Sequence, residues 1–443
     1  MNEIPSTFSQ QNGSQSVANR DKLLMLVATS LRMGVALIGF IVMARFLGPE
    51  NFGVIATAAA YGGFISIITD FGLTVSTLRN ASAQPECVSE ILADAIATKL
   101  VLTLAAAVIG LPVAMTILPT GQVSIYAIMF LGVIAYAIAD LSMVAMRVHR
   151  RFDIEATVVL STSLIMLISV IGTVIATRSL WATTLAFTLS RFVYLATTHM
   201  ALKRWLHIVI SWRRPLNSIN VTVKRSVAYA IDTILTNLSS QIDILIFAAL
   251  LTAHDVGIYQ AGARLVQVIM PFAMVLSTVY MPSLASAAIG SQQAVFRQHA
   301  RRVNFEFFAL AIVAASGFIF LGPFVTHAIY GDGYQALISL WPGFAIFTLL
   351  RLMAAGYGIQ LTALGFIRTR IVAQLLSMMT LCCSVWLLHS DFQIGVTSSL
   401  LGLSSLPVIV VCGGALIRNG NAEISLFATL LGSLILSLLM VLI

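Results

Sequence analysis

Charged residues are scarce in this chain of 443 residues. Asp, Glu, Lys and Arg make up 9% of it, whereas 59% of the residues are hydrophobic and the mean hydropathy is +0.96. A water-soluble domain carries roughly 25% charged residues. This shortage excludes an ordinary soluble protein and indicates a chain whose main solvent is lipid.

Cysteine is also rare, and its pattern excludes several site types. The chain has Cys87, Cys382, Cys383 and Cys412, with no Cys-x-x-Cys pair and no histidines at metal-ligand spacing. We therefore expect no metal site, no cofactor and no disulfide framework. The first nineteen residues lack the basic and apolar regions of a signal peptide, and we expect a disordered cytoplasmic tail there.

The alternating pattern of a membrane β-barrel is missing, and long apolar runs predict spanning helices of ~20 residues instead. We expect an all-α polytopic membrane protein with 12–14 transmembrane helices. Thirteen candidate segments lie at 22–46, 53–78, 90–118, 123–146, 156–177, 180–201, 226–251, 257–286, 303–329, 335–364, 370–389, 395–417 and 424–443.

The segments form two groups around a basic interval. The predicted parts are a tail at 1–21, an N-lobe of six helices at 22–202, a basic cytoplasmic linker at 203–225, a C-lobe of six helices at 226–418 and an additional C-terminal transmembrane segment at 419–443. The linker holds Pro215 and three basic pairs. It joins the lobes, and part of it could lie on anionic lipid headgroups.

The Lys and Arg residues outside the helix interiors gather on one side of the predicted topology. With the N-terminus inside, the cytoplasmic side holds eighteen of them, and the opposite side holds only Arg45 and Arg178. Cytoplasmic loops of membrane proteins carry such an excess, so a cytoplasmic N-terminus is predicted. The net charge of +8 therefore reflects topology, and no nucleic-acid partner is expected.

Two turns on the predicted outer side are similar to each other. One runs from Leu47 to Ile55 and the other from Leu251 to Tyr259. Each places an acidic or amide residue two positions before a glycine, Gly53 or Gly257, and then opens a helix rich in small residues. This is where a duplicated six-helix unit would place them, as in transporter repeats.

Five cations fall within the predicted spans: Arg32, Lys99, Arg191, Arg264 and Arg351. A charge in the bilayer is costly, so such residues usually face a water-filled cavity or a partner. One interpretation is a cavity that binds pyrophosphate, because guanidinium groups hold phosphate through paired hydrogen bonds. The other is snorkelling or structural ion pairing. Arg32, Arg191 and Arg351 lie nearest mid-depth.

Three carboxylates also lie deep in predicted helices: Asp70, Asp232 and Asp243. A carboxylate in this position could bind and release a coupling proton, or it could pair with one of the five cations. The sequence leaves both roles open. No catalytic residue is predicted.

Two stretches resemble a known family. The run Ala44–Gly53, followed by Asp70-Phe71-Gly72-Leu73, resembles the amino-terminal signature of Wzx-type oligosaccharide flippases. The run Gln241–Ile246, continuing through Val256–Leu265, is similar to the start of the second lobe in that family. The resemblance implies the MOP exporter fold, in which two bundles of six helices surround a cavity that opens alternately to either side. The thirteenth segment departs from that plan.

The resemblance also implies a function. Members of the family are non-enzymatic transporters of the bacterial plasma (inner) membrane that flip polyprenyl-pyrophosphate-linked oligosaccharides outward for exopolysaccharide, O-antigen or capsule synthesis. The implied partners are this lipid-linked oligosaccharide, membrane lipids, and the polysaccharide polymerase and export machinery.

Two other functions are weighed against this one. A multidrug or cation exporter of the same superfamily is disfavoured by arginines in the spans. A membrane polysaccharide polymerase or ligase would need a sizeable outer loop with catalytic residues, and the predicted outer loops are only a few residues long.

Overall fold

The computed structural model describes residues 7–117, 122–210, 216–238, 241–290, 293–387 and 393–418. These residues are helical almost throughout and include no strand. Nine segments among them are long and apolar enough to cross a membrane. The predicted all-α polytopic class is therefore confirmed, while the predicted segment at 424–443 lies outside the described residues.

The chain divides into two compact units. Unit 1 comprises Met1–Gly39 and Tyr61–Ile234, and unit 2 comprises Phe40–Ala60 and Leu235–Ile443. The tip of the first helical hairpin thus belongs to unit 2, whereas both of its arms belong to unit 1. The boundaries predicted for the lobes, the linker and the C-terminal segment remain predictions.

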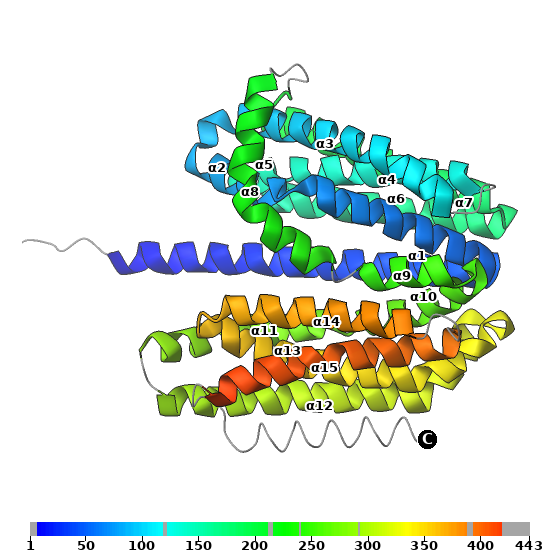
Figure 1. Cartoon of the computed structure of the whole chain (residues 1–443). Helices are drawn as coiled ribbons and strands as arrows, with labels where there is room; N and C mark the ends of the chain where they lie inside the picture. The colour runs from blue at the N-terminus through cyan, green and yellow to red at the C-terminus, as the bar shows by residue number, and fades with distance from the viewer. Residues whose placement is uncertain are drawn as a thin grey trace, which may run out of the picture. The chain divides into compact units, whose positions relative to one another are not determined.

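Unit 1 is built from the arms of α1 and the helices that follow it. These are α1 (Thr7–Asp70), α2 (Leu73–Ala83), the short 3₁₀ turn η1 (Pro85–Cys87), α3 (Val88–Ile117), α4 (Val123–Ser142), α5 (Val144–Val148), α6 (Phe152–Thr177), α7 (Leu180–Trp205) and α8 (Leu216–Leu238). Helix α7 packs against both α4 and α6, and α3 packs against α4. Figure 1 shows these four helices running beside one another.

The first arm of helix α1 starts earlier than predicted and ends at the predicted turn. It begins at Thr7, within the tail predicted to be disordered, because a helix extends from an existing nucleus more easily than it forms anew. It breaks at Gly48, whose φ of 75° favours glycine, and Pro49 supplies no N–H to the preceding turn. This break is the turn predicted between the first two helices.

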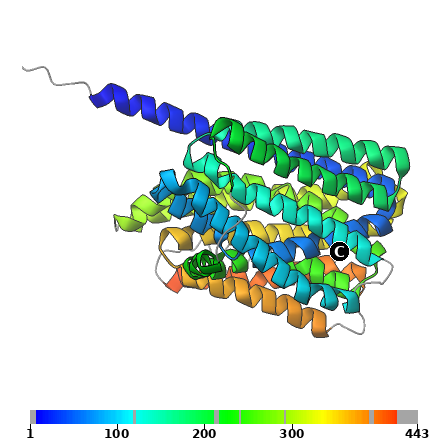
Figure 2. The same cartoon turned by 90° about the horizontal axis from the view of Figure 1, so that it is seen from above.

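Unit 2 holds the remaining helices. They are α9 (Ile242–Leu250), α10 (Ala253–Gln267), α11 (Met270–Ile289), α12 (Gln293–Val325), the π-helical turn η3 (Thr326–Tyr330), the 3₁₀ segment η4 (Asp332–Leu340), α13 (Trp341–Ala363), α14 (Ile367–Leu387) and α15 (Ile394–Arg418). Helix α13 packs against α12 and α15, and α15 also packs against α14. The long helices within the unit keep a common direction in Figure 2.

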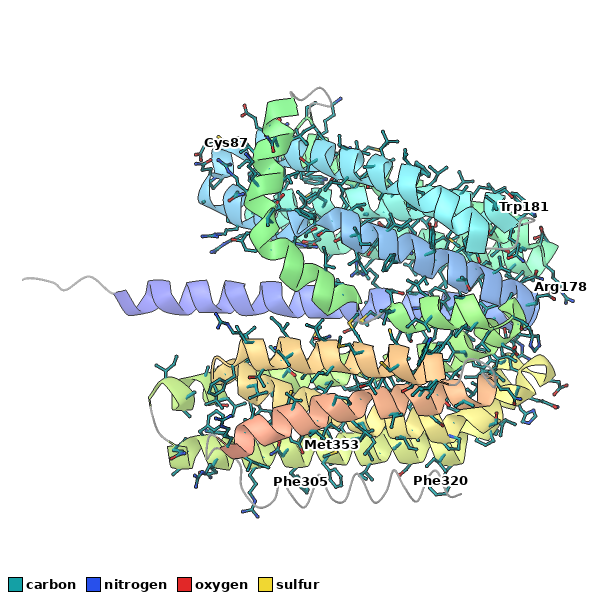
Figure 3. The ribbon with its side chains drawn as sticks, in the orientation of Figure 1. Cys87, Arg178, Trp181, Phe305, Phe320 and Met353 are labelled. Atoms are coloured by element: carbon teal, nitrogen blue, oxygen red, sulfur yellow. The ribbon has the colours of Figure 1, made fainter. Side chains whose placement is uncertain are left out.

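Apolar side chains lie on both the inside and the outside of unit 2. Trp341, Phe344 and Met353 of α13 are buried in its core, whereas Phe305 and Phe320 of α12 are 69% and 78% exposed. Figure 3 shows these two phenylalanines on the outer side of α12 and Met353 inside the unit. Large apolar groups can face outward in this way because the surrounding solvent is lipid.

The two similar turns meet in unit 2 at a backbone contact. A Cβ atom at Gly53 would lie 1.7 Å from the carbonyl oxygen of Ala253, and one at Gly257 would lie 1.9 Å from that of Pro49. The same offset along the chain relates Gly53 to Gly257 and Pro49 to Ala253. Only glycine allows the two helices to touch at this distance, as small residues do at other membrane helix crossings.

Polar contacts also fasten the hairpin tip to the rest of unit 2. The Nη1 atom of Arg45 donates to the carbonyl oxygens of Ala328 and Ile329, at 2.7 and 2.9 Å. The hydroxyl of Tyr334 donates to the carbonyl of Ala44 at 2.8 Å. Both Ala328 and Ile329 belong to the π-helical turn η3, so this irregular turn supplies the carbonyls that hold Arg45.

Candidate functional site

Unit 2 contains a cavity of about 680 Å³ that charged, polar and apolar side chains line together. Residues from α9, α10, α11, α13, α14 and α15 line it. Its charged lining residues are Asp243, Arg264, Arg351 and Arg370. Three residues predicted from the sequence, Asp243, Arg264 and Arg351, are thus brought to one cavity from three different helices.

Asp243 has a specific partner in this cavity. It lies in the first turn of α9, and its Oδ2 atom accepts a hydrogen bond from the hydroxyl of Tyr259 on α10. The Tyr259 side chain is fully buried, with its ring edge-on to Phe247 at 4.8 Å and stacked on Phe344 at 5.8 Å. These rings fix the hydroxyl and thereby the carboxylate that it holds.

Arg264, near the end of α10, is only partly satisfied. Its Nη1 atom donates to Oε1 of Gln267 at 3.0 Å, and its guanidinium carbon lies 4.1 Å from the ring centre of Phe40. Its Nε atom is buried and has no hydrogen-bond partner among the described residues. The side chain therefore retains donor capacity for a ligand.

The other two arginines of the cavity come from α13 and α14. Arg351 has no salt bridge to a carboxylate of the described residues, and it shares the cavity with Asp243. Arg370 donates from Nη1 to Oγ1 of Thr362 at 2.6 Å. The lining thus carries three guanidinium groups and one carboxylate, an excess of positive charge suited to an anion.

Two further predicted arginines lie together in unit 1. Arg32 of α1 and Arg191 of α7 line a small pocket with Tyr136 of α4 and Tyr194 of α7. The Nη1 atom of Arg32 donates to the Tyr136 hydroxyl at 3.1 Å and lies 3.9 Å from Oδ1 of Asp140.

Arg191 is held by aromatic rings. Its guanidinium carbon lies 4.5 Å from the ring centre of Tyr136 and 4.7 Å from that of Phe187. Such contacts attract a cation to the face of a ring without neutralising its charge. Arg191 therefore keeps its full positive charge at the edge of the pocket.

Lys99 and Asp70 form a buried ion pair elsewhere in unit 1. The Lys99 Nζ atom lies 2.6 Å from Oδ1 of Asp70, and the Thr74 hydroxyl donates to the same oxygen at 2.9 Å. Of the two roles left open for these residues, pairing is the one that the geometry favours. Arg32 likewise has a carboxylate within reach, so two of the five cations have acidic partners.

Asp232 is the third of the predicted carboxylates. The side chain of Asp232, on α8, lies outside the described part of the structure. Among the described residues, no group of three His, Cys, Asp or Glu side chains could hold a metal ion.

Four residues of these sites were missed from the sequence: Tyr136, Tyr194, Tyr259 and Arg370. The tyrosines could have been found as hydroxyl groups in otherwise apolar helices, because a buried phenol normally has a hydrogen-bond partner. Arg370 is the first residue of the segment predicted at 370–389, and it counts among the eighteen cations of the predicted cytoplasmic side. The structure shows that it also lines the cavity of unit 2.

Comparison with known protein families matches residues 19–288 to a family described as polysaccharide biosynthesis protein. Comparison with curated protein sequences gives no match.

Several solved structures are similar to the chain as a whole. A lipid II flippase, MurJ, in an inward closed conformation has a TM-score of 0.74 and 13% identity, covering 94% of this chain and 92% of its own. An inward-facing multidrug resistance MATE transporter of the MOP superfamily has a TM-score of 0.67 and 12% identity, covering 87% and 94%. A MOP superfamily transporter from Pyrococcus furiosus, described by the reverse polarity of its binding pocket, has a TM-score of 0.58 and 11% identity, covering 90% and 95%.

These likenesses establish the fold. The chain has the helical fold of MOP superfamily transporters, as the sequence resemblance implied. It is a multi-pass membrane protein, and the solved structures that share its fold are transporters and a flippase rather than enzymes.

Proposed function

We propose that this chain, which belongs to the polysaccharide biosynthesis protein family, moves a polyprenyl-pyrophosphate-linked oligosaccharide across the bacterial inner membrane. The headgroup is exposed first to the cytoplasm and then to the outer side, and it serves the synthesis of an exopolysaccharide, O-antigen or capsule. The family match and the fold shared with a lipid II flippase support this proposal.

The observation that carries the proposal is the charge of the cavity in unit 2. Arg264, Arg351 and Arg370 line it against a single carboxylate, Asp243, whose Oδ2 atom is already bonded to Tyr259. A pyrophosphate group carries several negative charges and many acceptor oxygens. Guanidinium groups with unused N–H donors, such as those of Arg264 and Arg351, are the side chains best suited to hold it.

The size and polarity of the cavity agree with this ligand. A volume of about 680 Å³ falls within the usual range for small-molecule sites. Ser277, Ser404, Ser405 and Gln374 also line it and can exchange hydrogen bonds with sugar hydroxyls. In this proposal the pyrophosphate meets the arginines while the prenyl chain stays in the lipid, because burying it in a polar cavity would forfeit its apolar contacts.

A cation exporter is the rival function, because the chain shares its fold with a multidrug resistance MATE transporter. An organic cation entering the cavity would face three guanidinium groups and one carboxylate. Like charges repel more strongly inside a protein than in water, because the effective dielectric constant is lower there. The cavity therefore disfavours a cationic substrate.

The proposal is tested by transport in proteoliposomes that contain the full chain and a polyprenyl-pyrophosphate-linked disaccharide. Arg351→Ala and Arg264→Ala each remove a charged donor worth about 1.5–3 kcal/mol, so each should slow transport about 10- to 100-fold. Arg351→Lys keeps the charge but loses the paired N–H donors of the guanidinium, so its transport rate should lie between those of Arg351→Ala and the wild type. The matched control is Arg301→Ala, an exposed arginine on α12 that no described residue bonds.

Two results would contradict the proposal. Unchanged transport in both alanine variants would remove the cavity from the mechanism. Wild-type protein that leaves the lipid-linked disaccharide in place but exports ethidium would favour the cation exporter.

A further inference from the structure

The small pocket of unit 1 shares no lining residue with the cavity in unit 2 and has its own chemistry. Its lining includes two arginines and two tyrosines: Arg32, Arg191, Tyr136 and Tyr194. The hydroxyl groups of Thr162, Ser163 and Ser190 also line it. Its volume of about 20 Å³ has room for about two oxygen atoms of a ligand group, and a whole sugar ring would not fit.

The pocket carries one uncompensated positive charge. Arg32 lies 3.9 Å from the carboxylate of Asp140, and the nearby Arg147 pairs with Glu155 at 2.8 Å. Arg191 has only ring contacts and lies against no carboxylate of the described chain. A group with one negative charge would balance it, whereas a pyrophosphate would bring more charge than the pocket can neutralise.

A second, independent feature also points to a ligand. The Tyr194 side chain is 95% buried, with 5% of its surface exposed, and its hydroxyl has no hydrogen-bond partner among the described residues. Leaving a buried hydroxyl unpaired is costly, and native structures do so rarely. An acceptor oxygen placed in the pocket beside Arg191 would satisfy the Tyr194 hydroxyl.

The other three hydroxyl groups already use their hydrogen atoms within the helices. Thr162, Ser163 and Ser190 donate to carbonyl oxygens of their own helices, at 2.6, 2.6 and 2.6 Å. Their oxygen lone pairs remain available to a ligand O–H group. The pocket therefore offers donors for an anionic oxygen next to acceptors for a hydroxyl, which is the pattern of a hydroxy acid.

We propose that this pocket binds a single carboxylate on the transported glycan, and hence that the glycan is acidic, with a uronic acid or a similar carboxylate-bearing sugar. The inference rests on the proposed function and sharpens it, because it assigns a chemical class to the sugar. Arg191 and the Tyr194 hydroxyl hold the two carboxylate oxygens, and the sugar ring stays outside the pocket.

The experiment compares two polyprenyl-pyrophosphate-linked disaccharides that differ only in the terminal sugar, glucuronate or glucose. The full chain is reconstituted in proteoliposomes, and the readout is the ratio of the acidic rate to the neutral rate. Tyr194→Phe, which removes one oxygen, and Arg191→Gln should each lower this ratio about tenfold. Arg204→Gln, an exposed change on the same helix, should leave the ratio at its wild-type value.

Each outcome bears on a different claim. If the wild type moves both lipids and neither pocket variant changes the ratio, the carboxylate site is overturned while the proposed function stands. If the wild type moves neither lipid, the proposed function itself fails.

A free anion is the competing occupant of the pocket. It is tested by replacing chloride with sulfate in the buffer during transport of the neutral lipid. A chloride dependence that disappears in Tyr194→Phe would assign the pocket to a halide and overturn the glycan carboxylate.

Discussion

The charged side chains within the helices of this protein fall into two kinds. Lys99 and Asp70 neutralise each other at 2.6 Å in a buried position, whereas Arg191 and Arg351 lack a hydrogen-bonded carboxylate among the described residues. A buried ion pair is retained by the fold itself. An uncompensated guanidinium in a cavity is better explained by an external anion.

The Lys99–Asp70 pair should therefore matter for stability. Lys99→Met or Asp70→Asn leaves one buried polar group without its partner, which typically costs about 3–5 kcal/mol. We expect each variant to unfold at a clearly lower temperature, measured by the intrinsic fluorescence of detergent-solubilised protein. Lys224→Met, a change at an exposed lysine, serves as the control.

The double variant Lys99→Met with Asp70→Leu separates pairing from other effects. Each single variant leaves one polar group without a partner, and the double variant leaves none. The stability of the double variant should therefore return toward the wild-type value. A pair that acts only in transport would give single variants with unchanged unfolding temperatures and slower transport.

Sequence reasoning finds such residues but cannot pair them. Depth along a predicted helix identified Arg32, Lys99 and Arg191 as intramembrane cations. The partners depend on the rotation of each helix about its axis, which an almost uniformly apolar helix does not reveal. Asp70 and Tyr136, which hold Lys99 and Arg191, lie on other helices and could not be assigned in advance.

At the scale of the helices, most predicted segments agree with the structure within a few residues. The segments predicted at 90–118, 156–177 and 395–417 appear as α3, α6 and α15. Long apolar runs make such helices easy to predict because the bilayer fixes their minimum length. The segment predicted at 226–251 is instead divided between α8 and α9, and a turn at Gln241 separates them. A short break inside an apolar run leaves little trace in composition.

The contact between the two similar turns gives a prediction about helix packing. In Gly257→Ala the new Cβ atom would lie 1.9 Å from the carbonyl oxygen of Pro49, which belongs to the backbone and cannot rotate away. The helices must separate, at a cost of about 1–3 kcal/mol. We expect a lower unfolding temperature and a smaller yield of folded protein.

Gly317→Ala is the matched control for this crossing. Gly317 lies within α12, and a Cβ atom there would meet nothing within 4 Å. Alanine is favoured over glycine in a helix by about 1 kcal/mol, so this variant should be as stable as the wild type or more so. Equal losses in both variants would show that the crossing has no special role.

At the scale of the whole molecule, the ends of unit 1 differ in charge. Figure 3 labels Cys87 at one end of the unit and Arg178 and Trp181 at the other. The predicted topology places Cys87 in the cytoplasm and Arg178 outside, because the cationic loops gather on the side of Cys87.

This orientation can be measured with a membrane-impermeant maleimide. In a variant in which Cys382, Cys383 and Cys412 are replaced by serine, Cys87 should react in inside-out vesicles and stay unlabelled in intact cells. Adding Arg178→Cys and Cys87→Ser should reverse the pattern. Labelling of Cys87 from outside intact cells would show that the N-terminus faces outward.

The family and the fold could also be predicted from the sequence. The motifs around Gly53 and Gly257 predict a Wzx-type family and the MOP fold. The family match and the solved structures confirm this prediction. What could not be predicted was the assignment of Phe40–Ala60 to unit 2. That assignment depends on contacts such as the one between Tyr334 and Ala44, which join residues far apart in the chain.

The crossing of Gly53 and Gly257 has the reciprocity of an isologous dimer interface, in which residue i meets j and j meets i. In a homodimer one codon would set both halves of such a contact. Here each half has its own codon, so the two can diverge. The two halves differ at Pro49 and Ala253, where the partner meets only the carbonyl oxygen, and they are identical at the glycines, where the backbones touch.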